Sequence, residues 1–267
     1  MRGDDGREPT DPTVGIDFGG TTIKGALVDT GTGQLASDWV HVDTPRPSSP
    51  DLVVEAIGHV VSRVATSTAA IGVAVPGIVR RGVLCSAANI DRGWIGVDVA
   101  TLLRRELDRP VDVLNDADAA GLAEVRFGAA RAGVAGDSAS GLVLVTTLGT
   151  GIGSALISGG TVVPNSELGH LEVDGRIAEA WAATSVRERE DLSYPEWAAR
   201  LTRYFQHLER LFSPDLFVVG GAVSQSWDLF GHLIDIATPT VPAVLGNRAG
   251  IVGAALAAAT QPVGRQR

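Results

Sequence analysis

Two glycine-rich segments that follow one pattern constrain the fold of this chain more than any other feature. The first is VGIDFGGTTIKGALVDTGTGQL (14–35) and the second is LVLVTTLGTGIGSALISGGTVV (142–163). In each, a run of apolar and β-branched residues leads into a Gly/Thr turn, and an alternating run and a second turn follow. This order is typical of consecutive strands joined by tight turns. The repetition predicts two similar lobes that each open with a β-meander.

The second segment does not match two common nucleotide-binding motifs. A dinucleotide fingerprint needs G-x-G-x-x-G and a helix directly after it. Here GTGIGS (149–154) has the spacing G-x-G-x-G and is followed by a strand-like run, and no G-x-x-x-x-G-K-[ST] loop occurs in the chain. These two classes of nucleotide-binding fold are therefore excluded.

The remaining sequence alternates between helix-like and strand-like patterns, which is typical of α/β proteins. Buried strands are predicted at 69–77, 111–115 and 215–224, the last running into a glycine turn and a helix. Apolar residues at helical spacing predict helices at 51–66, 98–107, 116–129 and 197–211, with a small-residue helix at 249–259. We expect two α/β lobes facing each other across a cleft, with the Gly/Ala/Ser segment 131–141 between them.

The expected organisation has five parts. They are an acidic, disordered N-terminus (1–13), an N-terminal lobe (14–130), a C-terminal lobe (131–248), a C-terminal helix that returns to the cleft (249–262) and a tail (263–267).

Composition excludes several classes of partner. With 22 basic and 31 acidic residues the formal charge is −9, so no overall basic field attracts nucleic acid or a membrane surface. The single cysteine, Cys85, excludes an internal disulfide and a multi-cysteine zinc site. The first 13 residues are polar and acidic, unlike a signal peptide or anchor, and no run approaches the length of a membrane span. We expect a soluble, cytoplasmic protein.

The paired glycine turns are suited to binding phosphate. Exposed backbone N–H groups at such turns form concave nests for phosphate oxygens, and the hydroxyls of Thr21, Thr147 and Thr150 add donors. Lys24, the only lysine of the chain, can add a compact positive charge, and Asp17 can hold Mg²⁺ through water. A single turn of this kind would more often be a simple tight hairpin. Two related turns and a third, GGAVS (220–224), favour phosphate binding.

An ordered set of motifs resembles the actin-like sugar kinases of the ROK family, over about residues 14–258. The motifs are DFGGTTIK (17–24), NDADAA (115–120), TLGTGIG (147–153), ELGH (167–170), GGAVS (220–224) and AGIVGAALAA (249–258). Within that family, four segments are most similar to members that take phosphate from inorganic polyphosphate: AANIDRGWIG (87–96), LNDADAAGLAEVRFGA (114–129), VPNSELGHLEV (163–173) and SPDLFVVGG (213–221).

This resemblance implies roles for particular residues. Asp116 would be the base that accepts the proton of the attacking sugar hydroxyl, which a carboxylate can do, although Asp at this position could also cap the helix. The residues expected to bind the sugar are Asn89, Asn115, Glu167, His170 and Glu179, with Glu172 competing for the place of Glu179. The residues expected to bind the phosphate donor are Asp17, Gly19, Gly20, Thr21, Lys24, Thr147, Gly149, Thr150, Gly151, Gly220 and Gly221.

The chain also departs from the family pattern. Many members carry a cysteine-rich zinc loop after the histidine of ELGH, whereas residues 171–178 (LEVDGRIA) contain no cysteine, so we expect no zinc site. Thr22 and Ala222 replace smaller residues that are usual in relatives and could crowd the donor.

The resemblance implies transfer of a phosphoryl group to the 6-hydroxyl of glucose, with Mg²⁺ as cofactor. Inorganic polyphosphate is the favoured donor and ATP is also possible; a strictly ATP-dependent glucokinase is the alternative. A sugar-sensing regulator is disfavoured because only 13 residues precede Val14, too few for a DNA-binding segment. We expect a homodimer, and acceptance of mannose stays open.

A polyphosphate chain would need a local track of cations, for which the candidates are Arg80, Arg81, Arg92, Arg126 and Arg131.

Overall fold

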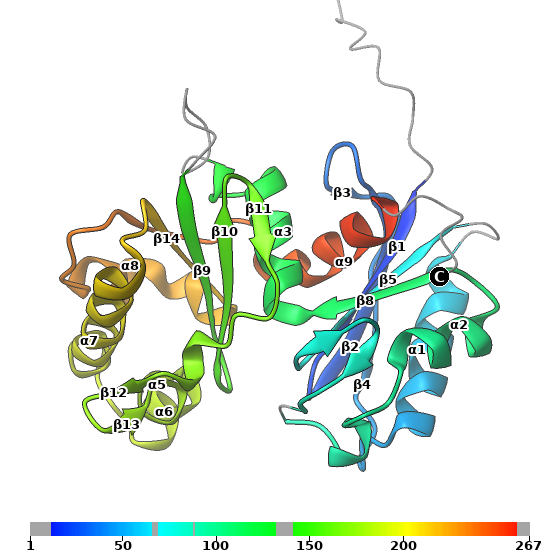
Figure 1. Ribbon diagram of the computed structural model, residues 1–267, viewed down its shortest axis with the longest axis horizontal. Helices are drawn as coiled ribbons and strands as arrows, with labels where there is room; N and C mark the ends of the chain where they lie inside the picture. The colour runs from blue at the N-terminus through cyan, green and yellow to red at the C-terminus, as the bar shows by residue number, and fades with distance from the viewer. Residues whose placement is uncertain (1–11, 66–68, 88, 132–140, 261–267) are drawn as a thin grey trace, which may run out of the picture.

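The predicted repeat is confirmed as two strand pairs in two lobes. The computed structural model describes residues 12–65, 69–87, 89–131 and 141–260, which form two α/β lobes side by side (Figure 1). In one lobe β1 (Thr13–Phe18) pairs antiparallel with β2 (Thr22–Asp29). In the other, β9 (Leu142–Leu148) pairs antiparallel with β10 (Ile152–Ser158). The two glycine turns join these pairs.

The central sheets of the two lobes have the same strand order. The first runs β3-β2-β1-β5-β8 with β4 also on β2, and the second runs β11-β10-β9-β14-β15. In both, the hairpin is continued by parallel strands. The other strands are β3 (Gln34–Leu35), β4 (Val40–Asp43), β5 (Ile71–Val75), β8 (Val111–Asn115), β11 (Thr161–Val163), β14 (Leu216–Gly220) and β15 (Thr240–Pro242), with small hairpins β6 (Val79–Arg80)–β7 (Val83–Leu84) and β12 (Glu172–Val173)–β13 (Arg176–Ile177).

The helices predicted from apolar spacing are confirmed as α1 (Pro50–Val64), α2 (Val99–Leu107), α3 (Asp116–Phe127), α7 (Tyr194–Phe212) and α9 (Ala249–Ala259). The described chain also has three short helices, α5 (Ala178–Ala182), α6 (Thr184–Arg189) and α8 (Trp227–Phe230). After β14 and the glycines of GGAVS a 3₁₀ segment, Ala222–Ser226, comes first, and the helix predicted beyond this turn is the single turn of α8. The serines of this 3₁₀ segment have side chains that compete for backbone hydrogen bonds and disfavour a helix interior.

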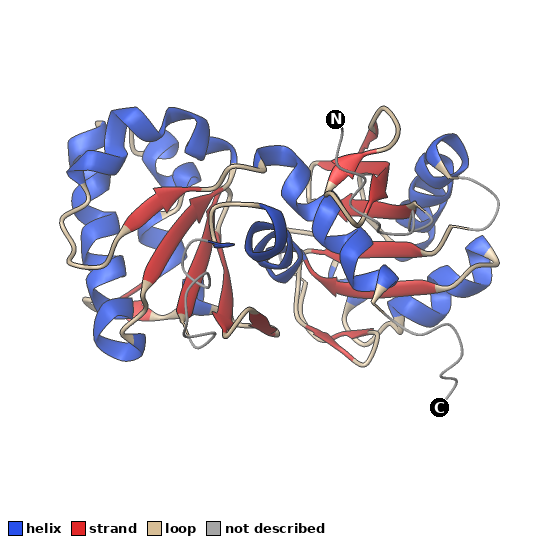
Figure 2. Cartoon of the chain, turned by 90° about the horizontal axis from the view of Figure 1, so that it is seen from above, coloured by secondary structure: helices blue, strands red, loops and turns tan. Residues whose placement is uncertain are grey.

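Helices α3 and α9 form the centre of the molecule. Seen from above, a pair of helices lies between the two sheets (Figure 2). Helix α9 contacts α3 and strands β1 and β5, while α3 contacts β10 of the second sheet. A Cβ at Gly253 would overlap the carbonyl oxygen of Ala119, so the small residues of α9 are what allow the two helices to approach so closely. The site therefore rests on two helices that contact each other, α9 packed on the first sheet and α3 packed mainly on the second.

Each lobe has its own hydrophobic core. Phe18 and Trp94 are fully buried in the first, with ring centroids 5.7 Å apart. The second contains a larger aromatic cluster on α7 and its neighbours, comprising Trp197, Tyr204, Phe205, Phe217 and Phe230. No helix among the described residues combines the length and the apolar character that crossing a membrane requires.

Segments at the two ends and at the lobe junction (1–11, 132–140 and 261–267) lie outside the described residues. The predicted disordered N-terminus, the tail and the linker at 131–141 fall largely or wholly on them, and the lobe boundaries stay predictions.

Candidate active site

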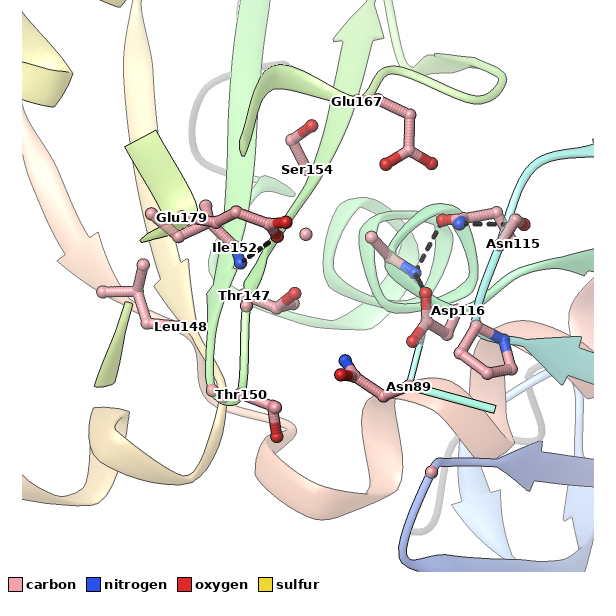
Figure 3. A pocket seen from close by; sticks show the side chains of 18 of the residues that line it. Asn89, Asn115, Asp116, Thr147, Leu148, Thr150, Ile152, Ser154, Glu167 and Glu179 are labelled. Carbon is pink, nitrogen blue, oxygen red and sulfur yellow. Dashed lines mark hydrogen bonds between the residues drawn. The ribbon is translucent and has the colours of Figure 1, made fainter. Parts of the chain in front are cut away.

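A cavity of about 730 Å³ opens between the lobes, within the range of about 300–1,000 Å³ usual for small-molecule sites. Carboxylates from both sides point into it, with Asp116 on α3 facing Glu167 and Glu179 of the second lobe (Figure 3). The residues expected to act on the sugar and the donor that line this cavity are Gly20, Thr21, Asn89, Asn115, Asp116, Thr147, Gly149, Thr150, Gly151, Glu167, His170, Glu179 and Gly221.

Asp116 is the first residue of α3, directly after β8. The helix cap is Asn115, whose Oδ1 accepts hydrogen bonds from Ala117 N–H (2.8 Å) and Asp118 N–H (3.0 Å). The Asn115 Nδ2 group donates to the carbonyl oxygen of Gly77 at 3.2 Å. The interpretation of Asp116 as the cap is therefore wrong, because its neighbour has that role. The Oδ1 atom of Asp116 accepts a hydrogen bond from Ala117 N–H at 2.8 Å, and no side chain of the described residues donates to this carboxyl.

The Asp116 carboxyl is tuned to titrate near neutrality. Burial is the largest cause that raises its pKa from 3.8 to about 7; the negative charge of Asp17 contributes to this rise, and the hydrogen bond from Ala117 N–H opposes it. Glu167 also raises the pKa of Asp116. A general base is most effective when its pKa lies close to the working pH. The position and the pKa of Asp116 both suit proton acceptance.

Three side chains of the second lobe gather on the opposite wall. Glu167 and His170 bound the 3₁₀ turn Leu168–His170, and Glu179 comes from α5. His170 Nε2 lies 3.3 Å from Glu179 Oε1, and Glu179 Oε2 accepts a hydrogen bond from Ile152 N–H at 3.4 Å. Glu179 thus links the acidic wall to the second glycine turn.

Glu179, and not Glu172, belongs to this cavity. Glu172 is exposed on β12 and does not line the cavity, although it lies nearer to His170 in the sequence. The ambiguity left by the sequence is thereby reduced to one candidate.

Asn165 joins the two lobes beside the acidic wall, and the sequence reasoning did not single it out. Its side-chain Oδ1 accepts from Val79 N–H at 2.8 Å and its Nδ2 donates to Val79 C=O at 3.0 Å, so the amide pairs with β6 as a strand would. Its own N–H donates to Asp118 Oδ2 at 2.7 Å. Burial raises the pKa of Asp118 to about 6, against this hydrogen bond. Asn165 therefore holds the segment that carries Glu167. The backbone of Asn165 has a φ of 62°, a conformation that Asn tolerates better than most residues, and this is visible only in the structure.

Residues of both glycine turns line one end of the cavity, which the sequence analysis predicts to bind the phosphate donor. The second turn is braced by Ser185 of α6, whose N–H donates to Gly149 C=O (3.0 Å) and whose Oγ donates to Thr150 C=O (2.6 Å). Gly19 lines neither this cavity nor its neighbour, and its N–H donates to Thr22 C=O at 3.0 Å within its own turn. At Gly221 the backbone has φ of 88°, which favours glycine, and a Cβ there would overlap Leu148 C=O.

Lys24 and Asp17 line a second, smaller cavity of about 170 Å³ that adjoins the first. The two residues are register partners in β1 and β2, and Lys24 Nζ lies 3.7 Å from Asp17 Oδ2. Burial raises the pKa of Asp17 although Lys24 opposes the rise. Gly220 lines this cavity, and Asp116, Thr147 and Gly221 line both. Lys24 and Asp17 thus form a charged pair in the smaller cavity, next to residues that line both cavities.

The predicted arginine track is not brought to the larger cavity. Arg80, Arg81 and Arg92 do not line it, and Arg126 and Arg131 line a separate cavity with Gly31, Thr32 and Phe127. Arg46, which the sequence reasoning missed, does line it. Among the described residues no group of three or more His, Cys, Asp or Glu side chains could hold a metal ion by itself.

Two lobes of equal topology, with a glycine turn of each at one cleft, make up the two-lobed actin-like fold of sugar kinases. The model of the ROK family matches residues 13–190, and the chain belongs to this family.

Its relatives include polyphosphate glucokinase of Mycobacterium tuberculosis (strain CDC 1551 / Oshkosh), which is 48% identical over 91% of this chain and 89% of the relative. The crystal structure of inorganic polyphosphate/ATP-glucomannokinase from Arthrobacter sp. strain KM is 49% identical, with a TM-score of 0.87 over 94% of this chain and 99% of that one. A ROK family glucokinase from Streptomyces griseus, solved in complex with glucose and AMPPNP, is 25% identical, with a TM-score of 0.76 over 92% of this chain and 99% of that one.

Proposed function

We propose that this protein transfers the terminal phosphoryl group of inorganic polyphosphate to the 6-hydroxyl of glucose, giving glucose 6-phosphate, and that ATP can serve as a second donor. The observation that carries the proposal is the position of Asp116, which lies between the acidic wall of the second lobe and the glycine turns of both lobes. The high identity to a polyphosphate glucokinase and to a polyphosphate/ATP-glucomannokinase supports the choice of substrates.

The chain's own residues account for the reaction as follows. Glu167, His170 and Glu179 bind sugar hydroxyls and orient the ring, and Asn89 adds an amide. Asp116 accepts the proton of the 6-hydroxyl as its oxygen attacks the terminal phosphorus, and the bond from phosphorus to the bridging oxygen of the donor breaks. Backbone N–H groups and hydroxyls of the turns around Thr21 and Thr150 bind the phosphate oxygens and stabilise the charge that develops on them.

A divalent cation, which we propose to be Mg²⁺, fits the donor end. Mg²⁺ in phosphoryl-transfer sites is held by one or two carboxylates, waters and the phosphates themselves, so it does not need a cluster of three protein ligands. Asp17 lines the smaller cavity, which adjoins the donor end of the larger one, and would hold the ion through water. When bound, the ion neutralises charge on the donor phosphates. No zinc site is proposed.

The choice of donor is tested by one comparison. Initial rates of glucose 6-phosphate formation are measured with glucose and either long-chain polyphosphate or ATP, at matched concentrations of terminal phosphate and with Asp116→Asn as the blank. We expect polyphosphate to give the higher kcat/KM. Activity with ATP alone would favour the ATP-dependent glucokinase, and no activity with either donor would overturn the proposal.

The remaining parts of the proposal concern context. We propose a homodimer in the cytoplasm that binds neither nucleic acid nor membrane, consistent with the net charge of −9. Light scattering coupled to size-exclusion chromatography tests the dimer. Mannose, assayed in place of glucose, tests the breadth of the sugar site.

A further inference from the structure

The charges that line the larger cavity are unbalanced. The lining contains three carboxylates, those of Asp116, Glu167 and Glu179, but in the described chain Arg46 is its one Lys or Arg residue. A polyphosphate chain carries about one negative charge per phosphate, and such polyanions bind proteins mainly through Lys and Arg contacts. Arg46 is therefore the side chain of this cavity best suited to a long polyanion.

Arg46 stands in a segment that is tied down on both sides. Before it, Thr44 N–H donates to Thr21 C=O at 2.9 Å and Thr44 Oγ1 donates to Gly19 C=O at 2.6 Å. After it, Ser48 accepts from Asp91 N–H at 2.9 Å and from Trp94 Nε1 at 2.8 Å.

Two prolines, Pro45 and Pro47, flank Arg46 and restrict the backbone further. Because little backbone freedom is left to lose, a ligand that binds Arg46 incurs little ordering cost. The Thr44 contacts also place the segment against the first glycine turn, at the donor end of the cavity.

The guanidinium of Arg46 is not engaged by the protein. The residue is exposed, and no hydrogen bond or ion pair joins it to another residue of the described chain. Other arginines of this protein are paired, such as Arg203, which forms two hydrogen bonds with Asp174. All N–H donors of an unpaired guanidinium are available to form bidentate hydrogen bonds with a phosphate group.

We propose that Arg46 binds the polyphosphate chain beyond the phosphates held by the glycine turns, and thereby favours long polyphosphate over ATP. This inference rests on the proposed function. ATP ends in a nucleoside after three phosphates, whereas a long chain continues toward the rim, where a bidentate cation adds a contact.

Arg46→Gln tests the inference by kinetics. We expect the KM for long-chain polyphosphate to rise about tenfold, the loss of one charge-assisted phosphate contact. The KM for glucose and the kcat with ATP should stay within twofold of wild type. The dependence of log(kcat/KM) for polyphosphate on log[salt] should also become less steep by about 0.7.

Two further variants make the result specific. Arg46→Lys keeps the positive charge but loses the bidentate guanidinium. Its salt dependence should therefore match wild type, and its KM for polyphosphate should lie between those of wild type and Arg46→Gln. Arg63→Gln removes the same charge from an exposed position on α1, outside the cavity, and should behave as wild type.

The outcomes separate this inference from the proposed function. Wild-type protein that uses ATP but not polyphosphate would overturn the proposed donor, and this inference with it. Wild-type protein that uses polyphosphate, together with an Arg46→Gln variant of unchanged KM and salt dependence, would overturn the inference alone. An equal rise of KM in Arg63→Gln would assign the effect to overall charge and would also overturn it.

Discussion

Replacing Asp116 with Asn should inactivate the enzyme and stabilise its fold at the same time. Burial and the neighbouring charges of Asp17 and Glu167 raise the pKa of Asp116 from 3.8 to about 7. A carboxyl whose folded pKa is raised binds its proton more tightly in the folded state, so its ionisation destabilises the fold. Asn has nearly the same shape and cannot ionise, so it removes this cost.

The size of the effect follows from the pKa. Each pKa unit corresponds to about 1.4 kcal/mol, so the rise from 3.8 to about 7 corresponds to about 4 kcal/mol above pH 7. Because the carboxyl faces a water-accessible cleft, we expect about 1–2 kcal/mol of this to be measured. The cost is absent below about pH 4, grows between about pH 4 and 7, and is fully present at higher pH.

Urea denaturation measures this directly. The free energy of unfolding of wild type and Asp116→Asn is compared at pH 5 and pH 8, in EDTA and without substrates, because a bound cation would stabilise the carboxylates. We expect the variant to be more stable, and by a larger margin at pH 8 than at pH 5. A variant that is less stable at pH 8 would refute the reasoning about burial.

Activity should change in the opposite direction. Without the base, kcat should fall by about 10²-fold or more, while glucose still binds, as followed by isothermal titration calorimetry. A near-normal kcat would contradict the role of Asp116 as the base.

Three other predictions test the surroundings of the site. Because Asp116 must be ionised to accept a proton, kcat/KM for glucose should rise between pH 5 and pH 8; a flat pH profile would contradict this. Asn165→Ala removes two hydrogen bonds to Val79, so we expect the free energy of unfolding to fall by about 1–3 kcal/mol and the KM for glucose to rise more than kcat falls, with Asn165→Asp intermediate. An unchanged KM would show that the amide is not needed to hold Glu167. Activity should require Mg²⁺ and survive a zinc-selective chelator; stoichiometric zinc found by elemental analysis would reveal an overlooked site.

Much of the fold could be predicted because its signals are local. The repeated glycine turns predict two equivalent hairpins. Alternating and helical spacing of apolar residues predicts the main strands and long helices to within a few residues of their observed bounds. The sequence also predicts the junction between β8 and α3 at Asn115, because a short apolar run is followed there by acidic residues that favour a helix N-terminus. Which of two adjacent polar residues caps a helix depends on backbone angles that the sequence leaves open. The sequence therefore allows Asp116 as the cap, whereas the structure gives this role to Asn115.

The features that the sequence did not reveal depend on contacts between distant segments. Asn165 contacts Val79 across 86 positions of the chain, and Arg46 enters the cavity only because its loop is tied to the first glycine turn. The five arginines predicted to form a polyphosphate track lie near motifs in the sequence. Proximity in the sequence does not indicate where a side chain lies on the folded surface. The contact of Lys24 with the donor phosphates stays a prediction, and its pairing with Asp17 in the β1–β2 register is a feature that the sequence analysis did not identify.

The energetics of the site and of the central helices are linked. Asp116 and Asp17 both have raised pKa values, so in the ionised, active form they oppose folding. Both carboxylates lie against the central helices, because Asp116 begins α3 and a Cβ at Gly250 of α9 would come within 2.8 Å of the Asp17 carboxyl. The close packing of α3 on α9 through Gly253 and the buried alanines of α9 adds apolar contacts that offset part of this cost. The small residues of α9 therefore help to keep two carboxylates buried at the junction between the lobes.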